Sequence, residues 1–216
     1  MKSYKAILFD FDGVLGKTME DNFHAWENTF NNHGISISKR EYFKSEGLPT
    51  KDLAIKYLKL NDMDSDLFSL LVKEKEEHYL RNHSFKLYPG AEPLVKNLKV
   101  NGYSLGLVTG GSGERLLNIG IESFLELFDV IITGDLENKG KPYPDPYLRA
   151  AKILKVANES CLVIENAPLG IESAKKAGMT CIAVSSTLEK KYLLEADRVV
   201  ANIIEIQEII EKGRLK

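Results

Sequence analysis

Short apolar runs recur along the 216-residue chain, separated by stretches long enough to form a helix. These runs are apolar at successive positions, which is typical of parallel strands that are buried on both faces. Their alternation with helical segments predicts an α/β fold with a doubly wound parallel sheet. The runs that predict strands are residues 6–9, 104–108, 130–133, 161–164, 181–184 and 198–200.

Several segments between these runs carry helix signals. In "PDPYLRAAKIL", Asp145 is the expected N-cap and Pro146 the first helical residue. The segment "PLGIESAKKAG" is expected to start after a proline and to stop at Gly178. The C-terminal run "IIEIQEIIEK" repeats isoleucine at helical spacing, which predicts a helix that lies on the sheet.

Residues of about 18–84 interrupt the alternation, because they contain helical patterns and no convincing strand. Within them Phe23, Trp26 and Phe30 share one helical stripe, which we interpret as the core of the block and not as a substrate platform. We predict a core domain made of residues 1–16 and 87–216 and a helical cap made of residues 17–86. An insertion held by two short linkers can move as a lid.

The net charge, the length of the apolar runs and the cysteine content bear on which partners and which compartment to expect. The net charge is −2 and there is no long basic run, which argues against nucleic-acid binding. No run approaches the roughly 20 apolar residues of a membrane span, and the N-terminal run is too short for a secretory signal. Cys161 and Cys181 lie in apolar runs, as expected for small buried residues in a reducing compartment. We expect a cytoplasmic protein, monomeric or a weak homo-oligomer, with neither nucleic acid nor membrane as partner.

Polar residues follow the predicted strands. Because ligands bind outside the carboxyl ends of the strands in a doubly wound sheet, these residues indicate the chemistry of the protein. They are Asp10 and Asp12 after the first strand, Thr109, Gly110 and Gly111 after the second, Lys141 on the loop after the third, and Glu165 and Asn166 after the fourth.

Two neighbouring carboxylates repel each other unless a cation lies between them. Carboxylate and carbonyl oxygens suit Mg²⁺, which would relieve the repulsion and keep Asp10 ionised as a nucleophile. Attack by Asp10 on phosphorus would form an aspartyl-phosphate. Asp12 is placed to protonate the leaving oxygen and later to activate water, provided that its pKa is raised towards neutrality.

The other strand-end residues suit a phosphate. Lys141 can hold a phosphate oxygen and offset the charge of the attacking carboxylate. Thr109 and the backbone N–H groups of Gly110 and Gly111 can form an anion-binding nest. We therefore expect a small phosphorylated metabolite as the ligand.

Four segments, "FDFDGVL", "VTGG", "GKPYPDPY" and "VIENAPLGIESAKKAGM", resemble in order and spacing the signature motifs of the haloacid dehalogenase-like (HAD) hydrolase superfamily. The resemblance covers the whole chain, and the helical insertion resembles the cap of the β-phosphoglucomutase-like and sugar phosphatase branch. It implies a Rossmann-like core. The roles that it implies are Asp10 as nucleophile, Asp12 as general acid and base, Thr109 and Lys141 as phosphate ligands, and Asp10, the Asp12 backbone carbonyl, Glu165 and Asn166 as Mg²⁺ ligands.

The chain departs from the family pattern in two respects, one at the metal site and one in the mutase scheme. Asn166 stands where the family commonly has aspartate, and an amide oxygen can bind a metal but supplies no negative charge. The mutase scheme has a histidine four residues after the cap-entry threonine, whereas here Thr18 is followed by Asn22. The stretch "GLPTKD" offers Thr50 and Lys51 where the mutase has an arginine. These differences favour hydrolysis over phosphate shuttling.

The sequence thus predicts a Mg²⁺-dependent phosphatase that acts on a small phosphorylated metabolite, most plausibly a sugar or polyol phosphate. A phosphosugar mutase is the first alternative, and a catalytically weakened phosphate-binding or regulatory protein, suggested by Asn166, is the second. The cap should select the substrate, and its candidate contacts are Asn22, Lys51 and Lys75. For both lysines a solvated helix face is the competing interpretation.

Overall fold

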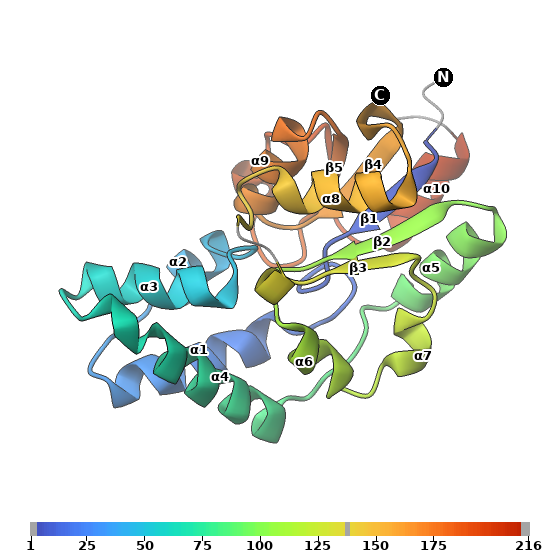
Figure 1. Cartoon of the computed structure of the whole chain (residues 1–216). Coiled ribbons are helices and arrows are strands. Elements are labelled where there is room, and N and C mark those ends of the chain that lie inside the picture. The colour runs from blue at the N-terminus through green and yellow to red at the C-terminus, as the bar shows by residue number, and fades with distance from the viewer. Residues whose placement is uncertain (1–3, 137–138, 213–216) are drawn as a thin grey trace.

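The computed structural model describes residues 4–136 and 139–212. In this part of the chain a six-stranded parallel sheet has the order β3-β2-β1-β4-β5-β6, so all carboxyl ends lie at one edge (Figure 1). The doubly wound sheet is confirmed, and each strand lies within one residue of its predicted place. The strands are β1 (Ala6–Phe9), β2 (Ser104–Val108), β3 (Val130–Ile132), β4 (Cys161–Glu165), β5 (Thr180–Val184) and β6 (Arg198–Val200).

Helices cover both faces of the sheet. Because successive side chains of a strand point to opposite faces, Ile7 and Phe9 of β1 pack with one helical layer, and Ala6 and Leu8 pack with the other. The first layer consists of α5 (Ala91–Val100), α6 (Gly113–Leu117), α7 (Glu122–Leu125) and α10 (Ile204–Lys212). The second consists of α8 (Asp145–Leu154) and α9 (Pro168–Lys176). Burial on both sides explains why the strands are apolar at successive positions.

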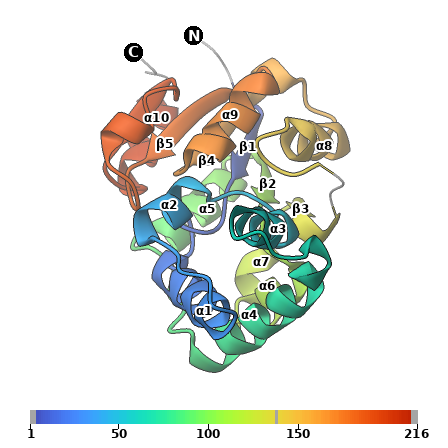
Figure 2. The same ribbon diagram turned by 90° about the vertical axis from the view of Figure 1, so that its left-hand side faces the viewer.

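A block of helices lies beyond the carboxyl edge of the sheet (Figure 2). It consists of α1 (Met19–Asn32), α2 (Lys39–Lys44), α3 (Thr50–Leu60) and α4 (Phe68–Asn82). Its interior is aromatic: the ring of Phe30 lies 4.8 Å from that of Trp26 and 4.9 Å from that of Tyr57. The apolar stripe of α1 is therefore the core of this helical block.

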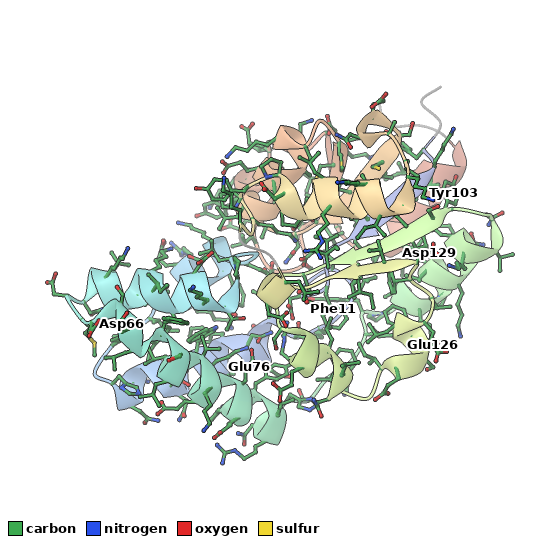
Figure 3. The ribbon with its side chains drawn as sticks, in the orientation of Figure 1. Phe11, Asp66, Glu76, Tyr103, Glu126 and Asp129 are labelled. Atoms are coloured by element: carbon green, nitrogen blue, oxygen red, sulfur yellow. The ribbon has the colours of Figure 1, made fainter. Side chains whose placement is uncertain are left out.

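Two adjacent connections join the helical block to the sheet. The Lys17 N–H donates to the Lys86 carbonyl at 2.8 Å, and the Tyr88 N–H donates to the Leu15 carbonyl at 2.8 Å. Phe11, which separates the two aspartates in the sequence, stands at this junction in Figure 3. The chain thus leaves and re-enters the sheet at one place, directly beside the end of β1.

One helix start differs from its predicted position. Helix α8 begins at Asp145, so Asp145 is the first helical residue and not the N-cap. The reason is that Pro144 already has helical dihedral angles (φ −74°, ψ −11°), which moves the cap one residue towards the N-terminus. Of the predicted core segments 1–16 and 87–216, residues 1–3, 137–138 and 213–216 lie outside the described residues. Within residues 4–136 and 139–212, no helix has the length and apolar character needed to cross a membrane.

Candidate active site

A cavity lies between the carboxyl edge of the sheet and the helical block. The sheet contributes the loops after β1 and β2, and the block contributes α1, α4 and the segment between α2 and α3. Charged and polar groups are concentrated in its wall, as expected at the point where strand order reverses in such a sheet. Those that matter below are Asp10, Asp12, Asn22, Glu46, Lys75 and Arg115.

Lys141 is buried between two carboxylates. Its Nζ donates to Asp10 Oδ1 and to Glu165 Oε1, both at 2.6 Å, and to the Val108 carbonyl at 3.1 Å. Burial alone would lower the pKa of Lys141, but the charges of Asp10 and Glu165 outweigh it and raise that pKa above its ordinary value. The ammonium therefore stays charged and joins the ends of β1, β2 and β4.

Glu165, the last residue of β4, supports this lysine. Its Oε1 also accepts from the Tyr147 hydroxyl at 2.8 Å, and its Oε2 accepts from the N–H groups of Asn166 (2.9 Å) and Ala167 (3.3 Å). Both carboxylate oxygens are thus occupied by protein donors. Glu165 thus positions Lys141 in this structure, and its role as a metal ligand, which the family resemblance implies, stays a prediction.

Asp10 is the other partner of Lys141 and keeps one oxygen unused. Its Oδ2 is buried and has no hydrogen-bond partner in the structure. Burial raises the pKa of Asp10, Lys141 lowers it, and the charges of Glu165 and Asp12 raise it again, to about 8. A further positive charge beside Oδ2 would favour the ionised form that a nucleophile needs.

Asp12 has a different environment. Arg115 forms a bidentate contact with Asp12. Its Nη1 donates to Oδ1 at 2.8 Å and its Nη2 donates to Oδ2 at 2.5 Å. Thr18 Oγ1 donates to Oδ1 at 2.5 Å and Asn22 Nδ2 donates to it at 3.1 Å. Burial would raise the pKa of Asp12, but Arg115 and Thr18 outweigh it and lower the pKa to about 2.

The expectation of a raised pKa at Asp12 is therefore wrong for this state of the protein. The expectation rested on burial and on a neighbouring acid, and it did not include Arg115, which lies six residues after Thr109 on α6. A single arginine in the apolar segment "RLLNIGI" was the available signal in the sequence, but nothing there connects it to Asp12.

Asn22 and Lys75 form a polar link inside the helical block. Lys75 Nζ donates to Asn22 Oδ1 at 2.8 Å, so Asn22 connects α4 to Asp12. Burial lowers the pKa of Lys75; Glu76 partly offsets this and Arg115 adds to it, which leaves the pKa at about 8. The structure thus brings both residues to the cavity, and their contact with substrate stays a prediction.

Lys51 does not reach this cavity. It is exposed on α3, and its ammonium lies 4.9 Å from the centre of the Phe68 ring. Its helix turns the side chain to the outside of the block, so the competing interpretation of a solvated helix face holds for Lys51. Thr50, its neighbour in the sequence, lines the cavity instead.

The glycine-rich turn after β2 is partly occupied by its own contacts. The Gly111 N–H donates to Thr109 Oγ1 at 3.0 Å, and the Thr109 hydroxyl lies 3.4 Å from Asp12 Oδ2. Gly110 and Gly111 both line the cavity. The hydroxyl of Thr109 therefore lies beside Asp12, and one of the two N–H groups that the nest would need is used internally.

Asn166 lies at the end of β4 and points its amide at the helical block. Its Nδ2 donates to Glu46 Oε2 at 2.8 Å and to Thr187 Oγ1 at 3.0 Å, while its Oδ1 is buried without a partner. Burial raises the pKa of Glu46 well above its usual range, and the charges of Asp10, Asp12 and Glu165 raise it further. Glu46 was not singled out from the sequence.

The donor set fits a hard divalent cation. Asp10 Oδ2 and Asn166 Oδ1 are buried oxygens without partners, and Mg²⁺ prefers oxygen ligands with only one or two carboxylates among them. Among residues 4–136 and 139–212, no group of three His, Cys, Asp or Glu side chains has metal-ligand spacing. A metal at this position would therefore depend on amide or backbone oxygens as well as carboxylates.

The geometry agrees with comparisons to known proteins. Residues 7–184 match the haloacid dehalogenase-like hydrolase family. The chain belongs to this family. It is a HAD-family phosphatase, a hydrolase that acts on phosphoric monoesters.

Named relatives cover nearly the whole hydrolase. Validoxylamine A 7′-phosphate phosphatase from Streptomyces hygroscopicus subsp. limoneus is 30% identical, over 94% of this chain and 96% of its own length. Hexitol phosphatase A from Escherichia coli (strain K12) is 27% identical, over 94% and 93%. A Bacteroides vulgatus structure with the provisional name β-phosphoglucomutase is 28% identical, with a TM-score of 0.90 over 100% of this chain and 91% of its own.

Replacing Lys141 by Met in this phosphatase tests the central contact. The change leaves the carboxylates of Asp10 and Glu165 buried without their shared counter-charge. We expect the free energy of unfolding to fall by about 3–5 kcal/mol, as measured by urea denaturation. We expect phosphate release to fall about 10²–10³-fold, the usual effect of losing a donor to a developing charge.

Lys139→Met is the matched control. Lys139 is exposed, and its ammonium lies 5.6 Å from the centre of the Tyr143 ring. Its loss should change the unfolding free energy by less than about 0.5 kcal/mol. Equal effects of the two substitutions would contradict a special role for Lys141.

Proposed function

We propose that this phosphatase hydrolyses a sugar or polyol phosphate with the help of Mg²⁺, through an aspartyl-phosphate on Asp10. One observation carries the proposal: Lys141 holds Asp10 Oδ1, while Oδ2 has no partner and Asp10 lines the cavity. An attacking carboxylate needs one oxygen fixed and the other available. The phosphatase names of the relatives support the same reaction type.

In the first step Asp10 Oδ2 attacks phosphorus, a new O–P bond forms and the bond from phosphorus to the substrate oxygen breaks. In the second step water attacks the same phosphorus and releases Asp10 and inorganic phosphate. In this proposal Lys141, which contacts Asp10, and Thr109, which lies beside Asp12, hold phosphoryl oxygens. When bound, Mg²⁺ would be held by Asp10, Asn166 and the Asp12 backbone carbonyl, and would offset the charge of nucleophile and phosphate.

Asp12 is proposed to give a proton to the departing oxygen and to take one from water. With a pKa of about 2, Asp12 is ionised at neutral pH as long as Arg115 grips it. Proton donation therefore requires that the contact with Arg115 loosens when substrate enters. In this proposal Arg115 keeps Asp12 ionised in the enzyme without substrate.

The substrate class is proposed from the wall of the cavity. We propose that residues 17–86 act as a cap, because they supply the side of the cavity that faces away from the phosphate site. That side offers Asn22, Lys75 and Ser45, which are all hydrogen-bonding groups. Such a wall suits a polyhydroxylated carbon chain, in line with the hexitol phosphate activity in one relative's name.

Phosphate release from a panel of sugar, polyol and nucleoside monophosphates, with and without Mg²⁺, tests the proposal. We expect release that depends on Mg²⁺, that is fastest with sugar or polyol phosphates, and that is lost in Asp10→Asn. Asparagine has the shape of aspartate but cannot serve as this nucleophile. Thermal melting of both proteins checks that the variant is folded.

Metal-independent release, or release at the wild-type rate by Asp10→Asn, would contradict the proposed route. The same panel separates a mutase from a phosphatase. A mutase would interconvert hexose 1- and 6-phosphates in the presence of a bisphosphate activator, with little net release of phosphate. Asn22, which stands where the mutase scheme has histidine, favours release.

Lys75 gives the reaction a predicted pH dependence. Its pKa of about 8 means that it is charged below pH 8 and neutral above, so its attraction for an anionic substrate disappears as the pH rises through 8. We expect kcat/KM to fall about tenfold on that alkaline side, the effect of losing one charged hydrogen bond. Lys75→Met should have the low value throughout and lack this fall.

The exposed Lys73 supplies the control, since its ammonium lies on the surface of α4, 4.0 Å from Glu77. Lys73→Met should keep the wild-type pH profile. An unchanged alkaline fall in Lys75→Met would show that another group titrates and that Lys75 does not contact substrate.

A further inference from the structure

Three buried oxygens beside the carboxyl edge of the sheet have no hydrogen-bond partner. They are Asp10 Oδ2, Asn166 Oδ1 and Glu46 Oε1. Their residues are exposed by only 2%, 0% and 8%, so water is largely excluded from them. A buried oxygen without a donor is unfavourable, and the oxygens of Asp10 and of the hydrogen-bonded pair Asn166 and Glu46 are the kinds of ligand that suit a hard cation. The third oxygen belongs to the helical block and not to the sheet.

The neutral amide of Asn166 faces the carboxyl group of Glu46. Asn166 Nδ2 donates to Glu46 Oε2 at 2.8 Å and to Thr187 Oγ1 at 3.0 Å, which fixes the direction of the amide. An aspartate at 166 would bring a second carboxylate within 2.8 Å of Glu46, and the two would repel. The amide at 166 and the acid at 46 are therefore complementary: the carboxyl group that position 166 lacks is supplied by Glu46.

The loop that carries Glu46 packs closely against Gly110, in the turn after β2 at the carboxyl edge of the sheet. A Cβ on Gly110 would come within 2.8 Å of the Gly47 carbonyl and 2.7 Å of the Leu48 carbonyl, so only glycine at 110 permits this approach. Position 13 must also be glycine: its φ is +84°, and a Cβ there would collide with Nδ2 of Asn166, the partner of Glu46. Glu46 is thus held in place by backbone contacts, independently of its own carboxylate.

We propose that Glu46 is a cap-borne ligand that completes the divalent-cation site with Asp10 and Asn166. The proposal rests on the proposed function, which places Mg²⁺ beside Asp10. It makes metal binding depend on the position of the helical block, because one ligand comes from residues 17–86 and the others from the sheet. Two carboxylates, one amide oxygen and the Asp12 backbone carbonyl would meet the preference of Mg²⁺ and Mn²⁺ for oxygen ligands.

The alternative role for Glu46 is mechanical. Its hydrogen bond to Asn166 would then only hold the helical block against the sheet, and the charge of the carboxylate would not matter. Glu46→Gln separates the two roles, because glutamine keeps an acceptor oxygen for Asn166 and removes only the charge.

Binding of Mn²⁺ alone, followed by the electron paramagnetic resonance signal of the free ion, tests the proposal without any substrate. We expect Glu46→Gln to weaken Mn²⁺ binding about tenfold or more, since even groups behind metal ligands change affinity by that factor. The double variant Glu46→Gln/Asn166→Asp moves the charge from one side of the pair to the other and should regain most of the affinity. Glu41→Gln, an exposed change on α2 beside Lys44, should bind like the wild type.

The outcomes are distinct. Loss in Glu46→Gln with recovery in the double variant supports the cap-borne ligand. Wild-type affinity in Glu46→Gln, or no recovery in the double variant, overturns it and leaves the Mg²⁺-dependent phosphatase intact. Absence of Mn²⁺ binding in the wild-type protein would overturn the metal requirement of the proposed function itself, and the cap-borne ligand with it. Circular dichroism of each variant establishes that it is folded.

Discussion

The buried ammonium of Lys141 is the contact on which the site depends. Two carboxylates at the ends of neighbouring strands would be strongly unfavourable in a buried position, and their common cation, 2.6 Å from each, makes the arrangement stable. For function, the contact with Lys141 matters because it fixes the orientation of the Asp10 carboxylate. One oxygen of Asp10 is fixed, the other stays without a partner, and Glu165 is fully used in holding the lysine in place.

The pKa values of Asp10 and Asp12, which are separated by one residue, are thus shifted in opposite directions. Asp10 shares Lys141 with Glu165 and has a pKa of about 8, whereas Asp12 is held by Arg115 and has a pKa of about 2. The helical block takes part in this division through Thr18 and Asn22, which both donate to Asp12. Movement of the block would therefore change the proton affinity of Asp12 as well as the shape of the cavity.

Residues in local motifs were predictable from the sequence, whereas long-range partners were not. The strand ends identified Asp10, Asp12, Thr109 and Lys141, because parallel topology brings the carboxyl ends of strands together. Arg115 lies 103 positions from Asp12, and Glu46 lies 120 positions from Asn166. Nothing local to these residues predicts the pairs, since the first depends on how α6 packs beside the end of β1 and the second on how the helical block packs on the sheet. For the same reason Lys75 and Lys51 were indistinguishable in the sequence, although one is buried and the other exposed.

The most direct test of the account is to look for phosphate on Asp10 during turnover. The enzyme would be mixed with its best substrate and Mg²⁺, quenched in acid within the first turnover, and digested for mass spectrometry. The account predicts one phosphoryl group on the peptide that contains Asp10, formed before free phosphate and absent in Asp10→Asn. Free phosphate that forms in the first turnover with no labelled peptide, or a label on another residue, would contradict it.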